Sequence, residues 1–377
     1  MLNSTGDKPS GGLFPVPYLR PSLGSSAIAP ALPYLRPSLG SYCGRSCYGA
    51  LIVFVLLLSA CATPYVQPPA FRHSEASLNG NYAVMDDGYR LPLSRWQAEG
   101  PSHAVVLAVH GMNDYSNSFN STGRYLSQHG ISVIAYDQRG FGNTQGHALW
   151  HGSERLVQDI HTMTGLLRER YPEQPLYLLG ESMGGAVVLA SLSPESPDID
   201  GIILVAPAIW SRSSMPYYQR ALLWLAAHTV PGKQLTGEGL ELKPSDNIEM
   251  LRALGRDPLV IKATRVDVLY GVSNLMDNAQ VASSDLNSDT LILYGKNDEI
   301  IPKQPTCEWL QSLPANAVRS THTVIYENGY HMLTRDLQAD TVLHDIAAWL
   351  LALDKQGLAE KNASDRMHVT SFCVHLR

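Results

Sequence analysis

Short apolar runs separated by segments of helical length dominate the middle of the chain. Uninterrupted apolar runs of this kind are typical of strands buried on both faces. Their alternation with helices predicts a mostly parallel sheet flanked by helices, and the predicted fold class is therefore α/β. The runs span residues 105–109, 131–136, 176–179, 202–206, 291–294 and 323–326.

A turn signal precedes the first of these runs. Asp86-Asp87-Gly88 separates two alternating segments, 82–84 and 89–93, and this arrangement predicts a β-hairpin. In sheets of the predicted kind, the ligand site lies beyond the carboxyl ends of the strands. The polar residues that directly follow the apolar runs are therefore the candidates for chemistry.

The interval 209–272 interrupts this alternation. It lacks strand-like runs and instead contains short amphipathic segments joined by Pro and Gly, which predict helices. An insertion at this point would cover the carboxyl edge of the sheet as a cap. Its apolar side chains are candidate substrate-binding residues, namely Tyr217, Tyr218, Leu222 and Trp224.

The N-terminal part of the chain differs in composition from the rest. Residues 1–60 combine a leader rich in Pro, Gly and Ser with a short uncharged apolar run that suits a signal peptide. The sequence 58–61 resembles the lipobox of bacterial lipoproteins, in which the cysteine, here Cys61, becomes the lipidated first residue. This resemblance implies a membrane-anchored lipoprotein of the bacterial cell envelope, on the periplasmic face of the outer membrane, with residues 61–80 as a tether. The alternative is a chance cysteine after an ordinary secretory signal.

Composition excludes several classes of partner. The chain of 377 residues has a formal net charge of -6 and no long basic run, so nucleic acid is not an expected partner. Its five cysteines form no C-x-x-C pair, no zinc-type spacing and no expected disulfide framework. The sequence therefore implies no metal and no organic cofactor. Residues 356–377 are polar and are expected to form an irregular tail.

A G-x-S-x-G motif lies between a predicted strand and a predicted helix. Within residues 180–185 the glycines allow strand and helix to approach closely, so that the hydroxyl of Ser182 is presented at a sharp turn. A serine nucleophile needs a base and an orienting carboxylate. His331 and Asp298 each follow a predicted strand downstream of the serine, in the chain order that this arrangement uses.

Other residues could fill the same roles. Glu299 and Asp289 are alternatives for the acid, whereas His322 lies at the start of a strand and His344 within a predicted helix. Two backbone N–H groups should stabilise an oxyanion. They are assigned to Met183, directly after the nucleophile, and to Met112, in the loop after the run 105–109.

These motifs together resemble those of the α/β-hydrolases. The resemblance extends from residue 81 to residue 351 and is strongest to the monoacylglycerol lipase and lysophospholipase branch, often labelled serine aminopeptidase-like. It implies a core in two parts, 81–208 and 273–355, around the cap at 209–272. It rests on the segments 109–112, 136–142, 180–185, 257–259, 295–298 and 330–331. Glu181 departs from the lipases, in which His is frequent before the nucleophile.

Three functional hypotheses follow. The first is a serine carboxylester hydrolase that cleaves a lipid-like acyl ester, a monoacylglycerol or lysophospholipid, held beside the membrane by a lipid anchor. The second is a serine aminopeptidase that binds the substrate's ammonium through acidic cap residues, for which Glu238, Glu241 and Asp246 are candidates. The third is a non-catalytic binding lipoprotein on a degenerate hydrolase fold.

Overall fold

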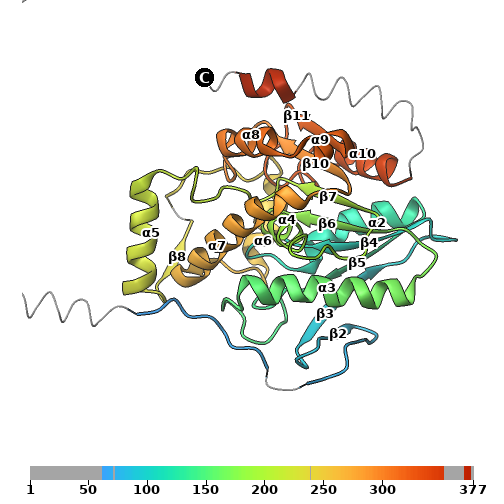
Figure 1. Ribbon diagram of the computed structural model, residues 1–377, viewed down its shortest axis with the longest axis horizontal. Coiled ribbons are helices and arrows are strands. Elements are labelled where there is room, and N and C mark those ends of the chain that lie inside the picture. The colour runs from blue at the N-terminus through green and yellow to red at the C-terminus, as the bar shows by residue number, and fades with distance from the viewer. Residues whose placement is uncertain (1–61, 71–72, 238, 352–368, 375–377) are drawn as a thin grey trace, which may run out of the picture. The chain divides into compact units, whose positions relative to one another are not determined.

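A mixed nine-stranded sheet forms the core of the computed structural model within the residues that it describes, 62–70, 73–237, 239–351 and 369–374 (Figure 1). The strand order is β1-β2-β3-β5-β4-β6-β7-β10-β11. Neighbours from β5 to β11 in this order run parallel, whereas β1, β2 and β3 pair antiparallel. The strands are β1 (Ser77–Leu78), β2 (Tyr82–Val84), β3 (Arg90–Trp96), β4 (Ala104–Val109), β5 (Ile131–Tyr136), β6 (Leu176–Glu181), β7 (Gly201–Val205), β10 (Asp289–Gly295) and β11 (Thr321–Tyr326).

Each predicted apolar run coincides with a strand, except that the run 202–206 extends one residue beyond β7, and the predicted α/β fold class is confirmed. Helices lie in the connections between successive parallel strands, as crossovers between such strands require, and α10 follows the last strand. They are η1 (Ser116–Phe119), α2 (Asn120–Gln128), α3 (Ser153–Arg170), α4 (Met183–Ala190), α5 (Tyr217–Thr229), α6 (Ile248–Arg256), α7 (Val266–Ala282), η2 (Ser283–Asp285), α8 (Lys303–Ser312), α9 (Ala315–Ser320) and α10 (Ala339–Leu351).

The predicted hairpin is also confirmed. Strands β2 and β3 pair antiparallel, with Tyr82 opposite Pro92, and the turn between them contains Gly88 at a φ of 76°. Glycine adopts this left-handed conformation without steric cost. In the sheet, β3 also pairs antiparallel with β5, and so links the hairpin to the parallel strands.

Alternate residues of the central strands enter two separate cores. In β4, Val105 and Leu107 pack with residues of α3, α4 and α7, whereas Val106 and Ala108 pack with residues of α2 and α10. This follows from the two-residue period of a strand, which sends successive side chains to opposite faces. Full burial of each large apolar side chain is worth roughly 1.5–3 kcal/mol, so the sheet is stabilised from both faces.

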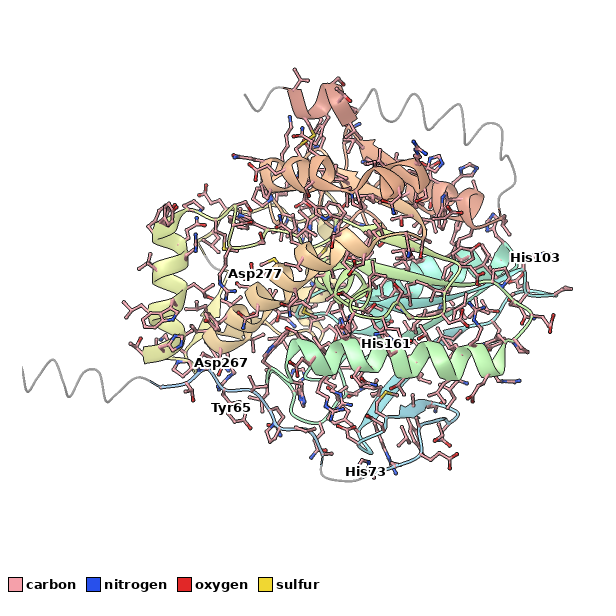
Figure 2. All side chains as sticks on the ribbon, viewed as in Figure 1. Tyr65, His73, His103, His161, Asp267 and Asp277 are labelled. Carbon is pink, nitrogen blue, oxygen red and sulfur yellow. A yellow bond between two sulfur atoms is a disulfide. The ribbon has the colours of Figure 1, made fainter. Side chains whose placement is uncertain are left out.

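Helices α5 and α6 lie in the interval predicted to be a cap. The same interval contains two short strands that the sequence analysis did not predict, β8 (Gln234–Thr236) and β9 (Ala263–Arg265), which pair antiparallel. The predicted boundary at residue 272 falls inside α7, whose buried side packs against the core. Two ion pairs join the interval to α7: Arg265 binds Asp267 and Arg212 binds Asp277, and both aspartates are labelled in Figure 2.

Two predictions were wrong in part: that residues 356–377 form an irregular tail, and that the cysteines form no disulfide framework. Residues 369–374 are helical, and Cys373 forms a disulfide with Cys307 on α8. The ring of Phe372 contacts the ring of Tyr294 in β10, so this segment packs beside the sheet. Cysteine spacing could not show this pairing, because the partners are 66 residues apart in sequence and connectivity does not follow from spacing.

The predicted leader, the signal segment and Cys61 lie outside the described residues. Within the described ranges, no helix has both the length and the hydropathy needed to cross a bilayer.

Candidate active site

Ser182 occupies a strained turn between β6 and α4. Its φ of 53° and ψ of -118° are uncommon for a residue with a side chain. The neighbouring glycines are required by contact: a Cβ on Gly180 would lie 2.6 Å from the Cα of Gly185, and one on Gly184 would lie 1.9 Å from the carbonyl oxygen of Val109. The turn therefore brings β6, α4 and the end of β4 into contact around the serine.

The structure brings the three predicted triad residues together at the carboxyl ends of the strands. Nε2 of His331 lies 2.9 Å from Oγ of Ser182, and Nδ1 of the same ring lies 2.8 Å from Oδ2 of Asp298. The other carboxylate oxygen of Asp298 accepts hydrogen bonds from the backbone N–H groups of Ile300 (2.8 Å) and Ile301 (2.9 Å). The carboxylate is thus fixed from both sides, with one oxygen directed at the imidazole.

This geometry defines the state of the imidazole. Because Asp298 is an acceptor, Nδ1 carries the proton, and the lone pair of Nε2 faces the serine hydroxyl. Burial disfavours the charged ring, but the charge and hydrogen bond of Asp298, aided by Glu181, outweigh burial and raise the pKa of His331, while Arg335 opposes them. The ring is therefore well suited to accept a proton from Ser182.

The loop after β4 lies directly beside the nucleophile. A Cβ on Gly111 would be 3.3 Å from the Cβ of Ser182, so this loop passes at van der Waals distance. The predicted oxyanion donors are the N–H groups of Met112, in this loop, and of Met183, the first residue of α4. Neither N–H has a hydrogen-bond acceptor among the described residues. Their role as oxyanion donors stays a prediction.

His110 locks the conformation of the same loop. Its Nε2 accepts the backbone N–H of Gln138 at 2.9 Å, so its Nδ1 bears the proton and donates to the carbonyl oxygen of Gly111 at 2.8 Å. Complete burial lowers the pKa of His110, which keeps the ring neutral. The side chain of Gln138 in turn donates to the carbonyl oxygen of His110 at 2.7 Å. These contacts join the loop after β4 to the loop after β5.

Comparison with known proteins identifies the family. The sequence pattern of the family described as serine aminopeptidase, S33, matches residues 100–338. The chain belongs to this family. The resemblance to the α/β-hydrolases is thereby confirmed, and as a member of the S33 family the chain is an enzyme, a serine hydrolase.

Relatives of the S33 chain include lipases. It is 24% identical over 278 residues to a monoglyceride lipase of Rattus norvegicus, covering 71% of this chain and 89% of the relative. It is 23% identical over 280 residues to a monoacylglycerol lipase of Mycolicibacterium smegmatis, covering 70% and 94%. A solved structure of a soluble variant of monoglyceride lipase from Saccharomyces cerevisiae, in complex with a substrate analog, superposes with a TM-score of 0.59 at 20% identity, covering 75% of this chain and 98% of that one.

The alternative triad residues of the S33 chain lie elsewhere. Asp289 and His322 are at the starts of β10 and β11, at the opposite end of the strands from Ser182. His344 lies in α10 with an exposed side chain, and Glu299 accepts the backbone N–H of Lys243. Of the three acidic residues considered, it is the predicted Asp298, and neither alternative, that bonds the imidazole of His331.

The predicted substrate-binding side chains all lie on α5. In this structure Tyr217, Tyr218, Leu222 and Trp224 are each more than half exposed, so they do not enclose an acyl chain. Exposed apolar side chains that gather on one short helix are unusual in a protein that binds nothing there. Their role in binding substrate stays a prediction.

A buried ion-pair cluster next to the triad was missed by the sequence analysis. Arg335 donates to the carboxylates of Glu181 and Asp114, each at 2.7 Å. Its only sequence signals were the acidic residue before the nucleophile and a basic residue four positions after His331. No metal site accompanies the cluster, since no group of three or more potential ligand residues is arranged to hold a metal ion in the part of the chain that the structure describes.

Proposed function

We propose that this S33 enzyme hydrolyses the carboxylic ester of a lipid-like acyl chain, a monoacylglycerol or a lysophospholipid, through an acyl-enzyme on Ser182. The observation that carries this proposal is the continuous hydrogen-bonded chain from Ser182 through His331 to Asp298. A hydroxyl held against the free lone pair of an oriented imidazole is the arrangement that acyl transfer to serine requires.

The reaction would proceed in two steps. Oγ of Ser182 bonds to the acyl carbon while its proton passes to Nε2 of His331, and the carbonyl oxygen becomes an oxyanion held by the N–H groups of Met112 and Met183. His331 then donates the proton to the departing alcohol oxygen as the carbon–oxygen bond breaks. Water next attacks the acyl carbon and gives a proton to His331, which returns it to Oγ as the carboxylic acid leaves.

Two observations support an acyl chain as part of the substrate. The relatives reported above are named monoglyceride and monoacylglycerol lipases. The exposed apolar side chains of α5 offer the surface that a chain of CH₂ groups prefers, since each buried CH₂ is worth about 0.8 kcal/mol. Activity should therefore rise with chain length until the apolar surface is filled.

Hydrolysis of p-nitrophenyl esters of graded chain length by the wild type and by Ser182→Ala tests this proposal. We expect a rising profile for the wild type and loss of activity in the variant. Equal activity in both proteins would exclude Ser182 as nucleophile, and a flat profile would exclude the acyl-binding role of α5. Trp224→Ala is a matched variant that should flatten the profile while leaving the shortest ester unaffected.

The aminopeptidase alternative remains open because the family's description names that activity. Such an enzyme needs an acidic side chain to hold the substrate's ammonium. Asp246 already accepts the backbone N–H of Leu337, Glu241 is exposed, and Glu238 lies outside the described residues. Assaying amino-acid p-nitroanilides and esters on one preparation separates the two activities, and faster anilide cleavage would favour the peptidase.

A non-catalytic binding lipoprotein has less support, because a binding protein gains nothing from an intact triad. A fluorophosphonate probe distinguishes these two possibilities. The esterase should be labelled at Ser182, whereas a binding protein should remain unlabelled.

We also propose that the enzyme is exported and anchored in the bacterial cell envelope through a lipid on Cys61. The disulfide between Cys307 and Cys373 supports export, since structural disulfides persist in oxidising compartments and are rare in the cytosol. Metabolic labelling with an alkyne fatty acid tests the anchor. Label should be present in the wild type and absent from Cys61→Ser, and equal labelling of both would exclude this site.

A further inference from the structure

Arg335 is a buried guanidinium shared between two carboxylates. Its Nη1 lies 2.7 Å from Oδ2 of Asp114, and its Nη2 lies 2.7 Å from Oε1 of Glu181. All three side chains are nearly inaccessible to solvent, at 9% exposure or less. A second contact comes from the preceding residue, because the hydroxyl of Thr334 lies 3.4 Å from the other oxygen of Glu181.

The three charged residues belong to the three segments that carry the reactive groups. Glu181 directly precedes the nucleophile at the end of β6, Asp114 lies in the loop after β4 that carries Met112, and Arg335 lies four residues after His331. One guanidinium thus joins the turn at Ser182 (the nucleophile turn), the loop after β4 (the oxyanion loop) and the loop after β11 that carries His331 (the base loop).

A pocket of about 380 Å³ is lined by Arg335, Asp114 and Thr334 and by residues of α6 and α10. The guanidinium of Arg335 is held by ion pairs to two carboxylates at once. Lysine could not replace it fully, since a single ammonium cannot reproduce the planar fork that reaches two carboxylates at once.

We propose that Arg335 is a positioning residue for catalysis: by joining Glu181 and Asp114 it holds the nucleophile turn, the oxyanion loop and the base loop in one reactive arrangement. The inference rests on the proposed serine hydrolase mechanism but not on the identity of the acyl substrate. Misplacement of reacting groups by about 1 Å can lower the rate about 100-fold. Loss of the ion pairs of Arg335 should therefore lower kcat more than it changes KM.

The cluster also has an electrostatic effect on the base. The charged groups that face His331 are Asp298 from the loop after β10, Glu181 from β6 and Arg335 from its own loop, and Asp114 faces Arg335 from the loop after β4. Glu181 raises the pKa of His331, and Arg335 lowers it. Loss of either charge should therefore move the pH dependence of the enzyme, in opposite directions.

Four variants test the proposal: Arg335→Lys, Arg335→Met, Glu181→Gln and the control Arg139→Met. Arg139 is a matched control because its guanidinium is also buried between two carboxylates, those of Asp87 and Asp159, which lie in segments without a predicted catalytic group. The readouts are kcat and KM on an ester, the rate of fluorophosphonate labelling at Ser182, the pH profile and the thermal unfolding midpoint.

We expect Arg335→Met to lower kcat and the labelling rate by about 10- to 100-fold, with KM changed less than about threefold. Arg335→Lys should recover part of this loss and keep the wild-type pH limb. The pH at which half of the activity is lost on acidification (the acid limb of the pH profile) should be higher in Arg335→Met and lower in Glu181→Gln. Arg139→Met should lose stability while its folded fraction keeps the wild-type kcat and pH limb.

The outcomes separate this inference from the proposed function. If folded Arg335→Met labels as fast as the wild type, with an unmoved pH limb, Arg335 serves stability alone and the proposal is overturned. If Ser182 labels in an Arg335-dependent way but no ester is cleaved, the positioning role stands and the substrate class fails. If Ser182 does not label in the wild type, the mechanism itself fails.

Discussion

Asp298→Asn is the substitution whose effect the structure determines most closely. In the wild type, Oδ1 of Asp298 accepts two backbone N–H groups at 2.8 and 2.9 Å, and Oδ2 accepts the proton on Nδ1 of His331. The two N–H groups can be satisfied only by the amide oxygen of asparagine. The NH₂ group must then face the imidazole and donate to Nδ1, so the proton moves to Nε2, the nitrogen that faces Ser182.

A protonated Nε2 cannot accept the serine proton, so the variant loses its general base without losing its fold. The corresponding change in a serine protease triad lowers kcat about 10⁴-fold, and we expect a loss of this order, equivalent to about 5.5 kcal/mol of transition-state stabilisation. The loss of the carboxylate should also lower the pKa of His331, since its charge and hydrogen bond raise that pKa in the wild type.

Steady-state ester hydrolysis and fluorophosphonate labelling measure this effect, with thermal unfolding as the check on folding. Asp298→Ala is the matched variant: it lacks an amide donor that would enforce the wrong tautomer, so it should be no less active than Asp298→Asn. A rate for Asp298→Asn within about tenfold of the wild type would contradict the tautomer argument.

Three further predictions concern stability and pH. Cys373→Ser should lower the free energy of unfolding by about 4 kcal/mol in urea denaturation, and reductant should then have no further effect. Gly184→Ala should yield little folded protein, because its Cβ would lie 1.9 Å from the carbonyl oxygen of Val109. The control is Gly165→Ala in α3, where nothing lies within 4 Å of the added Cβ, and its thermal unfolding midpoint should be unchanged or higher. The rate of wild-type ester hydrolysis should fall on acidification with a midpoint above the ordinary histidine pKa of about 6.5, because the pKa of His331 is raised and the ring becomes protonated at a higher pH. A midpoint below that value would contradict the assignment of His331 as the base.

The sheet and the triad were predictable from local pattern. Buried parallel strands require uninterrupted apolar runs, and the carboxyl ends of such strands meet at one edge, so polar residues after them converge. Ser182, Asp298 and His331 each follow a strand end, and this position, together with the G-x-S-x-G motif and the chain order of the three residues, predicted that they converge. The role of the glycines beside Ser182 was also predictable, since a sharp turn there requires the strand and the helix to approach more closely than side chains would allow.

The remaining features depend on contacts between distant segments. The ion pairs of Arg335 span 154 residues to Glu181 and 221 residues to Asp114, and no local periodicity marks such partners. Strand β8 is exposed along its length, so it lacks the alternation that marks a half-buried strand. The predicted boundary at residue 272 lies within α7, which runs without interruption from Val266 to Ala282, and no local pattern in the sequence marks a division there.

The central claim is that Ser182, activated by His331, is the acyl acceptor. Rapid acid quench of the enzyme during turnover of a p-nitrophenyl ester, followed by peptide mass spectrometry, tests it directly. The account predicts the mass of the acyl group on the peptide containing Ser182, and no such adduct in Ser182→Ala or His331→Ala. Ester hydrolysis by the wild type with the acyl group on another residue, or undiminished acylation of Ser182 in His331→Ala, would contradict it.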